Sequence, residues 1–328
     1  MAEVFPEKEL DAVIAAIKAV HGNCAALVLE SRSARIVYLS NPEYSVMRRF
    51  SPGSLVKPLA AAVLLEHAGE LGVRPDETVL CGGCFPPPAS AAFTGIDGRI
   101  FNLPMDEKTR SRCFRCSLKK GHGRIALSEA IMRSCNVYFL TQASRNPALF
   151  YTLFMEFWRL NEPSGALLGD MREPPSRSSA ELSAFQAAAS AIGEGPAVRV
   201  SLLRMTQAYA ALFEGTPQLR PYRDSAEAAA AQYPLSIRPA HRKLILTALS
   251  RALYEGTLKG LAVKNGRVRL LGGKTGSGTR EGGRYATHGW NILHFEYRGG
   301  RYVLGVFVER GRGAVEAAEL SARLIDAM

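Results

Sequence analysis

Three short motifs in a defined order constrain this chain more than any other feature. They are Ser-x-x-Lys at 54–57, Ser-x-Asn at 134–136 and Lys-Thr-Gly at 274–276. A hydroxyl is a poor nucleophile until a neighbouring group removes its proton, so a serine three residues before a lysine pairs a nucleophile with a base. Each motif is weak alone, but their order and separation favour one shared active site for acyl transfer.

The first motif is predicted at the start of a helix. Apolar residues recur at helical spacing over 55–71, and Gly72 follows as a C-cap. Ser54 is therefore expected at the helix N-terminus, with Lys57 on the same face. Lys57 can act as a base only when it is neutral, and burial together with a second cation such as Lys274 lowers a lysine pKa. The alternative is that Ser54 is only an N-cap.

The second motif is predicted at a helix boundary. The pattern of 127–132 is helical, and an apolar stretch continues after a break at Ser-x-Asn. Ser134 could pass a proton between Lys57 and a leaving group, and Asn136 offers an amide donor and an acceptor. The alternative is that both side chains only satisfy backbone groups at the helix join.

The third motif is predicted in a strand near 266–276. Side chains alternate across a strand, so Lys274 and Gly276 share one face while Thr275 and Ser277 share the other. The glycines allow a second backbone to approach closely, which suits a peptide substrate added along the strand edge. The alternative is a Gly-rich hairpin with an exposed lysine.

Together these residues resemble the transpeptidase domain of penicillin-binding proteins. The resemblance covers the chain from about residue 23 and includes the stretches GHGRIALSEAIMRSCNVYF, YEGTLKG and THGWNILHFE. It implies an α+β fold of the β-lactamase/transpeptidase type, in which an antiparallel sheet flanked by helices stands beside a mainly helical lobe. Glu194 departs from the usual glutamine of the family, and Asn291-Ile292 replaces its usual aromatic-glycine pair.

The resemblance implies a peptidoglycan D,D-transpeptidase that acts on D-alanyl-D-alanine stem peptides and binds β-lactams, without a catalytic cofactor. The implied roles are nucleophile for Ser54, base for Lys57, proton relay for Ser134, amide contact for Asn136, and substrate binding for Lys274, Thr275, Gly276 and Ser277. The near alternative is a D,D-carboxypeptidase, in which water replaces the acceptor amine. Further alternatives are a β-lactam or muropeptide sensor or scaffold without turnover, and an esterase or amide synthase.

The expected organisation is an N-terminal helix or leader at 1–22 and a transpeptidase domain at 23–328, with a cysteine-containing insert at about 77–123. The helical lobe is expected at about 54–255. The expected strands are near 24–30, 35–40, 266–276, 286–297 and 301–309, with covering helices at 7–20 and 314–327. The family resemblance, more than the pattern, implies that the two chain ends build one sheet.

Location and charge lead to separate expectations. The sequence contains no apolar run long enough for a transmembrane helix and no signal-peptide pattern, whereas the family resemblance implies an extracytoplasmic site of action. The net charge is +11, and basic residues concentrate within 108–124. This stretch either attracts anionic cell-wall polymer or a membrane surface, or is a solvated loop. Nucleic acid is not expected as a partner, because no matching module is present.

Two Cys-x-x-Cys pairs form a second informative feature. The pairs are Cys81 with Cys84 and Cys113 with Cys116. Two such pairs separated by a loop match a structural zinc site with four thiolate ligands, and the alternative is a set of disulfides in an oxidising compartment. His122 could replace one thiolate, although the family resemblance already accounts for it. Cys24 and Cys135 are expected to be buried small side chains.

Overall fold

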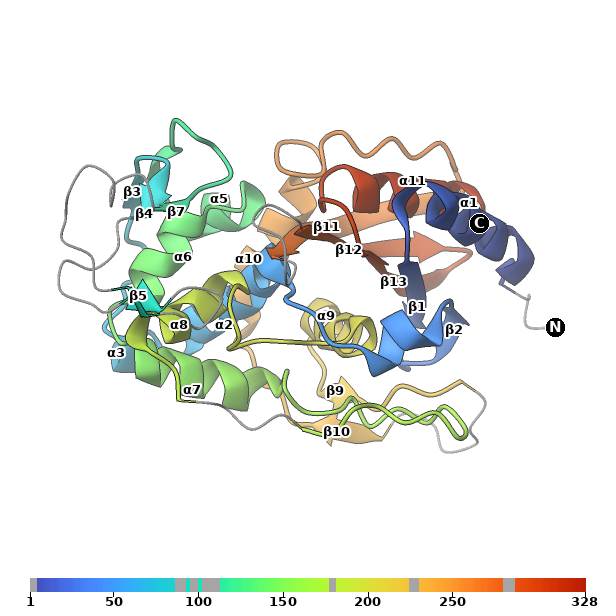
Figure 1. Ribbon diagram of the computed structural model, residues 1–328, viewed down its shortest axis with the longest axis horizontal. Coiled ribbons are helices and arrows are strands. Elements are labelled where there is room, and N and C mark those ends of the chain that lie inside the picture. The colour runs from blue at the N-terminus through green and yellow to red at the C-terminus, as the bar shows by residue number, and fades with distance from the viewer. Residues whose placement is uncertain are drawn as a thin grey trace.

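Two lobes make up the protein in this computed structural model: a sheet with helices packed on it, and a mainly helical lobe beside it (Figure 1). The structure describes residues 5–85, 93–94, 100–101, 113–176, 181–223, 230–279 and 287–328. The first and last helices lie together on the sheet lobe (Figure 1). Among the described helices, none is long and apolar enough to cross a bilayer.

The central sheet is antiparallel and is built from both ends of the chain. Its strands are β1 (Cys24–Glu30), β2 (Ile36–Leu39), β11 (Val268–Thr279), β12 (Thr287–Tyr297) and β13 (Gly300–Val308). Their order is β11-β12-β13-β1-β2, so β1 pairs with β13 although the two are far apart in the sequence. The five predicted strands and their assembly into one sheet are therefore confirmed. β11, which carries Lys-Thr-Gly, is an edge strand of this sheet.

Helices cover both faces of the sheet. On one face, α1 (Glu7–His21) and α11 (Glu316–Asp326) bury Leu10 and Leu320 in an apolar cluster shared with the strands. On the other face, α9 (Leu202–Glu214) packs against β1 and β13. Nearly every residue of β1 is buried, as expected for a strand that is covered on both sides.

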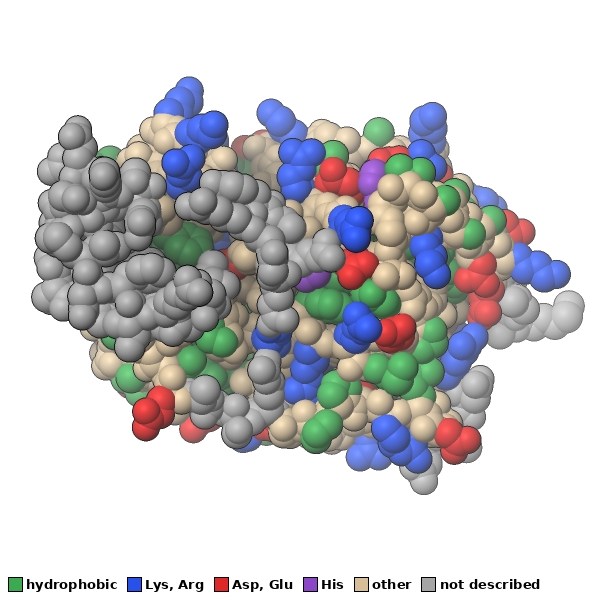
Figure 2. All heavy atoms as spheres, viewed as in Figure 1, with side chains coloured by type: hydrophobic (Ala, Val, Ile, Leu, Met, Phe, Trp, Pro, Cys, Tyr) green, Lys and Arg blue, Asp and Glu red, His purple; other side chains and the backbone are tan. Residues whose placement is uncertain are grey.

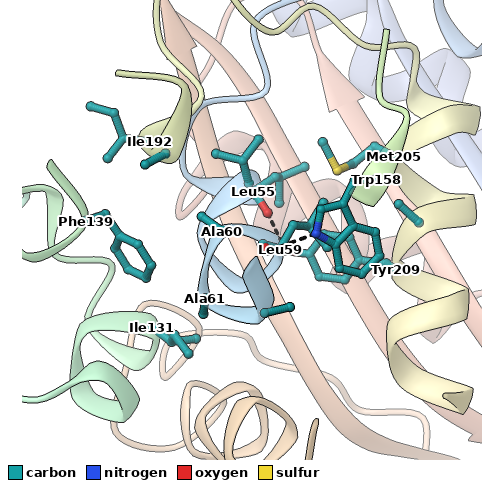
Figure 3. Packing of buried hydrophobic residues seen from close by; sticks show 14 of the residues in the cluster. Leu55, Leu59, Ala60, Ala61, Ile131, Phe139, Trp158, Ile192, Met205 and Tyr209 are labelled. Atoms are coloured by element: carbon teal, nitrogen blue, oxygen red, sulfur yellow. Dashed lines mark hydrogen bonds between the residues drawn. The ribbon is translucent and has the colours of Figure 1, made fainter. Parts of the chain in front are cut away.

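The helical lobe is organised around one buried helix, α2 (Lys57–Glu66). Nearly all of its side chains are buried, and Figure 3 shows its apolar residues packed among side chains of the surrounding helices. Trp158 Nε1 donates to the Leu59 carbonyl at 2.9 Å, and the Tyr209 hydroxyl donates to the Leu55 carbonyl at 2.7 Å. A helix that is apolar all round belongs in a core, so the backbone that carries the first motif is held from every side.

The remaining elements surround α2 or lie at the edges of the two lobes. The other helices are α3 (Ala68–Leu71), α5 (Leu127–Met132), α6 (Asn136–Ala143), α7 (Pro147–Trp158), α8 (Ala184–Ala189) and α10 (Pro239–Arg251), with a π turn at Glu43–Met47 and 3-10 turns at Gly53–Val56 and Ser190–Ile192. The paired short strands are β3 (Val79–Cys81) with β8 (Gly123–Ile125), β4 (Cys84–Phe85) with β7 (Phe114–Arg115), β5 (Phe93–Thr94) with β6 (Ile100–Phe101), and β9 (Gln218–Leu219) with β10 (Ala231–Tyr233). Much of the predicted insert, including the basic residues at 108–112, lies outside the described residues.

The single helix predicted over 55–71 is wrong in its start and its continuity. A 3-10 turn at Gly53–Val56 precedes α2, and the backbone leaves the helical region at His67 before α3 begins. The physical reason for the 3-10 turn is Pro58, which has no N–H to offer the Ser54 carbonyl. The Lys57 N–H donates to that carbonyl instead, which closes a tighter turn.

Candidate functional site

The three motifs converge on the side chain of Lys57. Its Nζ lies 2.9 Å from Ser54 Oγ, 3.2 Å from Ser134 Oγ, 2.7 Å from the Ser134 carbonyl oxygen and 2.6 Å from Asn136 Oδ1. Lys274 Nζ donates to Ser134 Oγ at 2.9 Å. The five residues predicted to be catalytic are therefore contiguous in space, and Ser134 stands between the two lysines.

Ser54 does not act as a helix cap. It lies within the 3-10 turn, where no side-chain capping bond forms, and its hydroxyl faces Lys57. The turn lies tightly against β11, since a Cβ at Gly53 would overlap the Ser277 carbonyl. Gly53 also has a positive φ. A Cβ at Gly276 would likewise meet the Pro52 carbonyl at 2.6 Å. The glycine of Lys-Thr-Gly thus admits the nucleophile turn against the strand.

Ser134 adopts a strained backbone conformation. Its φ is +58°, a region that residues other than glycine seldom occupy. It lies between α5 and α6, and its side chain is nearly inaccessible to solvent, with a relative exposure of 5%. Non-glycine residues in such conformations cluster at functional sites, where the surrounding structure holds them in place. Here the strain directs the hydroxyl of Ser134 toward both lysines.

Both lysines are completely buried, which disfavours their charged forms. Burial lowers the pKa of Lys57 to about 8. The pKa of Lys274 lies well below its usual range, first because of burial and second because Lys57 is close by. Two adjacent buried amines resist carrying two protons at once. A neutral amine is therefore accessible near neutral pH, which is what a base for Ser54 needs.

The strand β11 presents different groups on its face and its edge. Thr275 Oγ1 donates to Thr257 Oγ1 at 2.9 Å, and Ser277 Oγ accepts from the Gly313 N–H at 3.0 Å, on the face opposite Lys274. The Thr279 N–H points away from β12 and donates to Glu194 at 3.3 Å. Because alternate residues of a strand point their N–H groups the same way, the Ser277 N–H faces the same free edge.

Glu194 also lies at the site, although the sequence marks it only as a departure from the resembling family. It follows Gly193, at which a Cβ would overlap the Gly53 carbonyl. Burial raises the pKa of its carboxyl to about 7. Its position beside the nucleophile turn depends on contacts between distant segments, so the sequence offered only the substitution itself as a signal.

The cysteines group differently from the predicted four-thiolate set. Cys84 and Cys113 form a disulfide with a Cα–Cα distance of 5.7 Å. The ligand atoms of Cys81, Cys116, His122 and Cys135 instead lie within 4.8 Å of one another. The reason is strand pairing: β4 and β7 bring Cys84 beside Cys113, whereas Cys81 ends β3 and Cys116 lies next to the Ser-x-Asn turn. The prediction for Cys84 and Cys113 is corrected accordingly.

The Cys81, Cys116, His122 and Cys135 group, here called the Cys3His cluster, has donors suited to a metal ion. His122 Nδ1 lies 3.5 Å from the sulfur of Cys81 and 3.5 Å from that of Cys116, and the Cys116 and Cys135 sulfurs are 3.7 Å apart. Tetrahedral zinc with bonds of about 2.3 Å to sulfur and about 2.0 Å to nitrogen implies ligand separations of about 3.5 to 3.8 Å. The donor set and these three separations therefore match what a tetrahedral metal site requires.

The Cys3His cluster touches the catalytic motif directly. Cys135 is the middle residue of Ser-x-Asn, between Ser134 and Asn136. Asn136 Nδ2 also donates to the carbonyl of Arg115 at 2.7 Å, and Arg115 precedes Cys116. The backbone that carries Ser134 and Asn136 is thus tied to the cluster at two points.

Solved structures match this fold over nearly the whole chain, whereas no protein-family model and no curated protein matches the sequence. The transpeptidase domain of Burkholderia pseudomallei penicillin-binding protein 3 aligns with a TM-score of 0.71 and 19% identity, over 98% of this chain and 91% of that one. Penicillin-binding protein A from M. tuberculosis, solved as a ceftriaxone acyl-enzyme complex, aligns with a TM-score of 0.73 and 17% identity, over 98% and 78%. In a peptidoglycan synthase complex the values are 0.71 and 18%, over 98% of this chain and 60% of the matched one.

The chain therefore has the fold of penicillin-binding protein transpeptidase domains. The predicted fold class is confirmed, since the antiparallel sheet, the helices on its faces and the helical lobe are all present. The resemblance stated from the motifs is confirmed at the level of this fold.

The close approach at Gly193 predicts a difference between two glycines of one turn. Gly193 and Gly195 both have positive φ, but a Cβ at Gly195 would meet no atom within 4 Å. Gly195→Ala should cost about 1 kcal/mol of stability through backbone strain alone. Gly193→Ala should cost about 2 kcal/mol more, because it also displaces the nucleophile turn. Urea denaturation of both variants measures the difference, and equal losses would contradict the packing argument.

Proposed function

We propose that this protein is a D,D-transpeptidase that cross-links peptidoglycan through an acyl-enzyme on Ser54. The observation that carries the proposal is the position of Lys57 Nζ, which lies within hydrogen-bond distance of Ser54, Ser134 and Asn136 at once. Its donor substrate would be a stem peptide ending in D-alanyl-D-alanine. The fold, which it shares with the transpeptidase domain of a penicillin-binding protein, supports this choice.

In the acylation step, neutral Lys57 takes the hydroxyl proton of Ser54, and the serine oxygen attacks the carbonyl carbon of the penultimate D-alanine. The backbone N–H groups of Ser54 and Ser277 would stabilise the oxyanion of the tetrahedral intermediate, a contribution of several kcal/mol in such sites. The C–N bond then breaks, and Ser134 relays the proton from Lys57 to the departing amine. The terminal D-alanine leaves, and the rest of the donor stays as an ester on Ser54.

In the second step an amine attacks the ester carbonyl. The amine loses a proton to Lys57, the new amide bond forms, and the Ser54 oxygen leaves and recovers its proton. Water in place of the amine would give a D,D-carboxypeptidase, and failure of this step would give a β-lactam or muropeptide sensor. The buried, interconnected lysines favour an enzyme over a scaffold, since burying two amines is costly without a chemical use.

The substrate would be held along the free edge of β11. Lys274 would supply a cation for the terminal carboxylate of the donor while Lys57 is neutral. Thr275 and Ser277, which we assign to substrate binding as well, lie on the same strand with their hydroxyls on its other face. Asn136 would contact the peptide amide of the donor. The transpeptidase domain would comprise residues 23–328. The protein would act outside the cytoplasm, as members of the resembling family do.

The basic stretch supports a weaker proposal about anionic partners. Its described basic residues, Arg115, Lys119, Lys120 and Arg124, are exposed. Lys and Arg side chains also project at several places on the face drawn in Figure 2. Such a surface would favour approach to anionic cell-wall polymer or lipid headgroups.

The first prediction from the proposed function concerns the nucleophile. Incubation with benzylpenicillin should add the mass of one penicillin to the wild-type protein and none to Ser54→Ala, because only the serine oxygen can form the ester. Intact-protein mass spectrometry measures the adduct. Ser51→Ala serves as a control, since Ser51 is buried beside the same turn and lies outside the proposed machinery. An adduct on Ser54→Ala, or none on folded wild type, would contradict the proposal.

The second prediction concerns pH. The base form of Lys57 appears as pH rises through about 8. The acylation rate constant should therefore increase about tenfold per pH unit below that value and level off above it. Stopped-flow or quenched acylation by benzylpenicillin between pH 6 and 9.5 measures the profile, with thermal melting as a check that the protein stays folded. A flat profile would remove Lys57 from the role of base.

We also propose that the Cys3His cluster holds a structural zinc ion, with Cys81, Cys116, His122 and Cys135 as ligands. Zinc bound there would be a cross-link, since a closed tetrahedral site leaves no position for a substrate. It would join the ends of the cysteine-containing insert to the Ser-x-Asn turn, and so fix the backbone on which Ser134 and Asn136 stand.

The third prediction separates the two proposed ligand sets. Metal analysis should find about one zinc per chain in wild type and in Cys84→Ser, and much less in Cys81→Ser. The reason is that Cys81 belongs to the Cys3His cluster and Cys84 does not. Cys24→Ser is the matched control, since Cys24 is buried in β1 away from the cluster. Chelation of wild type should lower the melting temperature by about 5 °C or more and slow acylation. Loss of zinc from Cys84→Ser would instead favour the four-cysteine set.

A further inference from the structure

The carboxylate of Glu194 lies at the end of the edge strand β11. Its Oε2 accepts from the Thr279 N–H at 3.3 Å. No ion pair joins it to a Lys, Arg or His among the described residues. The residue keeps some exposed surface, and a ligand in the site would reach the carboxylate through it. The pKa of its carboxyl is raised to about 7, mainly by burial.

The position of Glu194 is fixed relative to the nucleophile. The Gly53 N–H donates to the Gly193 carbonyl at 3.1 Å, so the turn that carries Glu194 lies directly against the turn that carries Ser54. The Glu194 carboxylate is also close enough to Lys57 to raise the pKa of that lysine. The charge of Lys57 in turn lowers the pKa of the Glu194 carboxyl, against the larger effect of burial. Glu194 therefore lies at the site, on the side where β11 ends.

The direction of a bound donor follows from the groups that would hold its two ends. Lys274 would bind the terminal carboxylate, and the Ser277 N–H would bind the oxygen of the reacting carbonyl. The rest of the donor must then continue past Ser277 toward Thr279, because a peptide added to a strand edge runs along it. The next N–H on that edge belongs to Thr279 and is occupied by Glu194. The part of the donor before D-alanyl-D-alanine thus approaches the carboxylate.

We propose that Glu194 recognises a positively charged side chain on the residue that precedes D-alanyl-D-alanine in the acyl donor. This inference rests on the proposed function, because it uses the orientation of the donor at Ser54. An ammonium would give the half-buried carboxylate an ion-pair partner, which none of the residues that the structure describes supplies. A charge-assisted hydrogen bond there is stronger than one between neutral groups. A glutamine, which the resembling family usually has here, would lack this charge. Glu194 is thus a specificity residue, not a group that takes part in the chemistry.

The test uses two penicillins that differ by one charge. One is benzylpenicillin, and the other carries an aminomethyl group on the para position of the same ring, which is an ammonium at pH 7.5. The acyl side chain of either compound leaves the reacting carbonyl in the direction of Thr279. Second-order acylation rate constants are measured by intact-protein mass, in 50 mM and in 1 M NaCl. The proteins are wild type, Glu194→Gln and the control Asp170→Asn, which removes an exposed acid elsewhere.

We expect the cationic penicillin to acylate wild type and Asp170→Asn about tenfold faster than benzylpenicillin at low salt, and less so at high salt. Glu194→Gln keeps an oxygen to accept from the Thr279 N–H but has no charge, so its rate ratio should approach one.

A ratio near one in wild type, or a ratio that Glu194→Gln leaves unchanged, overturns this inference while Ser54 acylation stands. If neither penicillin acylates folded wild type, the proposed function fails, and this inference fails with it. Should Glu194→Gln not fold, the wild-type ratio and its salt dependence decide the question.

Discussion

The site depends on the complete burial of Lys57 at the first turn of a buried helix. A lysine removed from water needs partners for its polar head, and Lys57 finds them in Ser54, Ser134 and Asn136. These partners come from the Ser-x-x-Lys and Ser-x-Asn motifs. The hydrogen bonds that the buried amine needs therefore also bring the two motifs together. Burial has a second effect, since it lowers the pKa of Lys57 toward the range where a neutral base exists.

Close contacts between backbones hold this arrangement in register. The turn around Gly53 lies between the Ser277 carbonyl of β11 and the turn at Gly193, and side chains larger than hydrogen do not fit at these contacts. Three distant segments of the chain therefore meet at the nucleophile. Gly276 of the Lys-Thr-Gly motif takes part in this packing, because a Cβ there would overlap the Pro52 carbonyl.

The cysteine-containing region belongs to the same assembly. Cys135 lies between Ser134 and Asn136, and its sulfur is 3.7 Å from that of Cys116. Ser134 next to it holds a left-handed backbone conformation that serine does not favour. A cross-link at Cys135 would restrain that conformation. The mainly helical lobe is thus packed around α2 near the site, and a metal ion in the Cys3His cluster would add a cross-link there.

The sequence by itself determined the local chemistry and the class of fold. The spacing of Ser54 and Lys57 places both on one helical turn, and the alternation along β11 separates Lys274 from Thr275, because both relations depend only on backbone geometry over a few residues. The strand and helix patterns at the two chain ends predicted the elements of the sheet, whereas their assembly into one sheet was implied mainly by the family resemblance. Only the tertiary structure decided how Cys81 and Cys116 are grouped, since many pairings of thiols share one spacing along the chain. It also decided that Glu194 lies between the end of β11 and the turn that carries Ser54, because that position results from contacts between segments that are far apart in sequence.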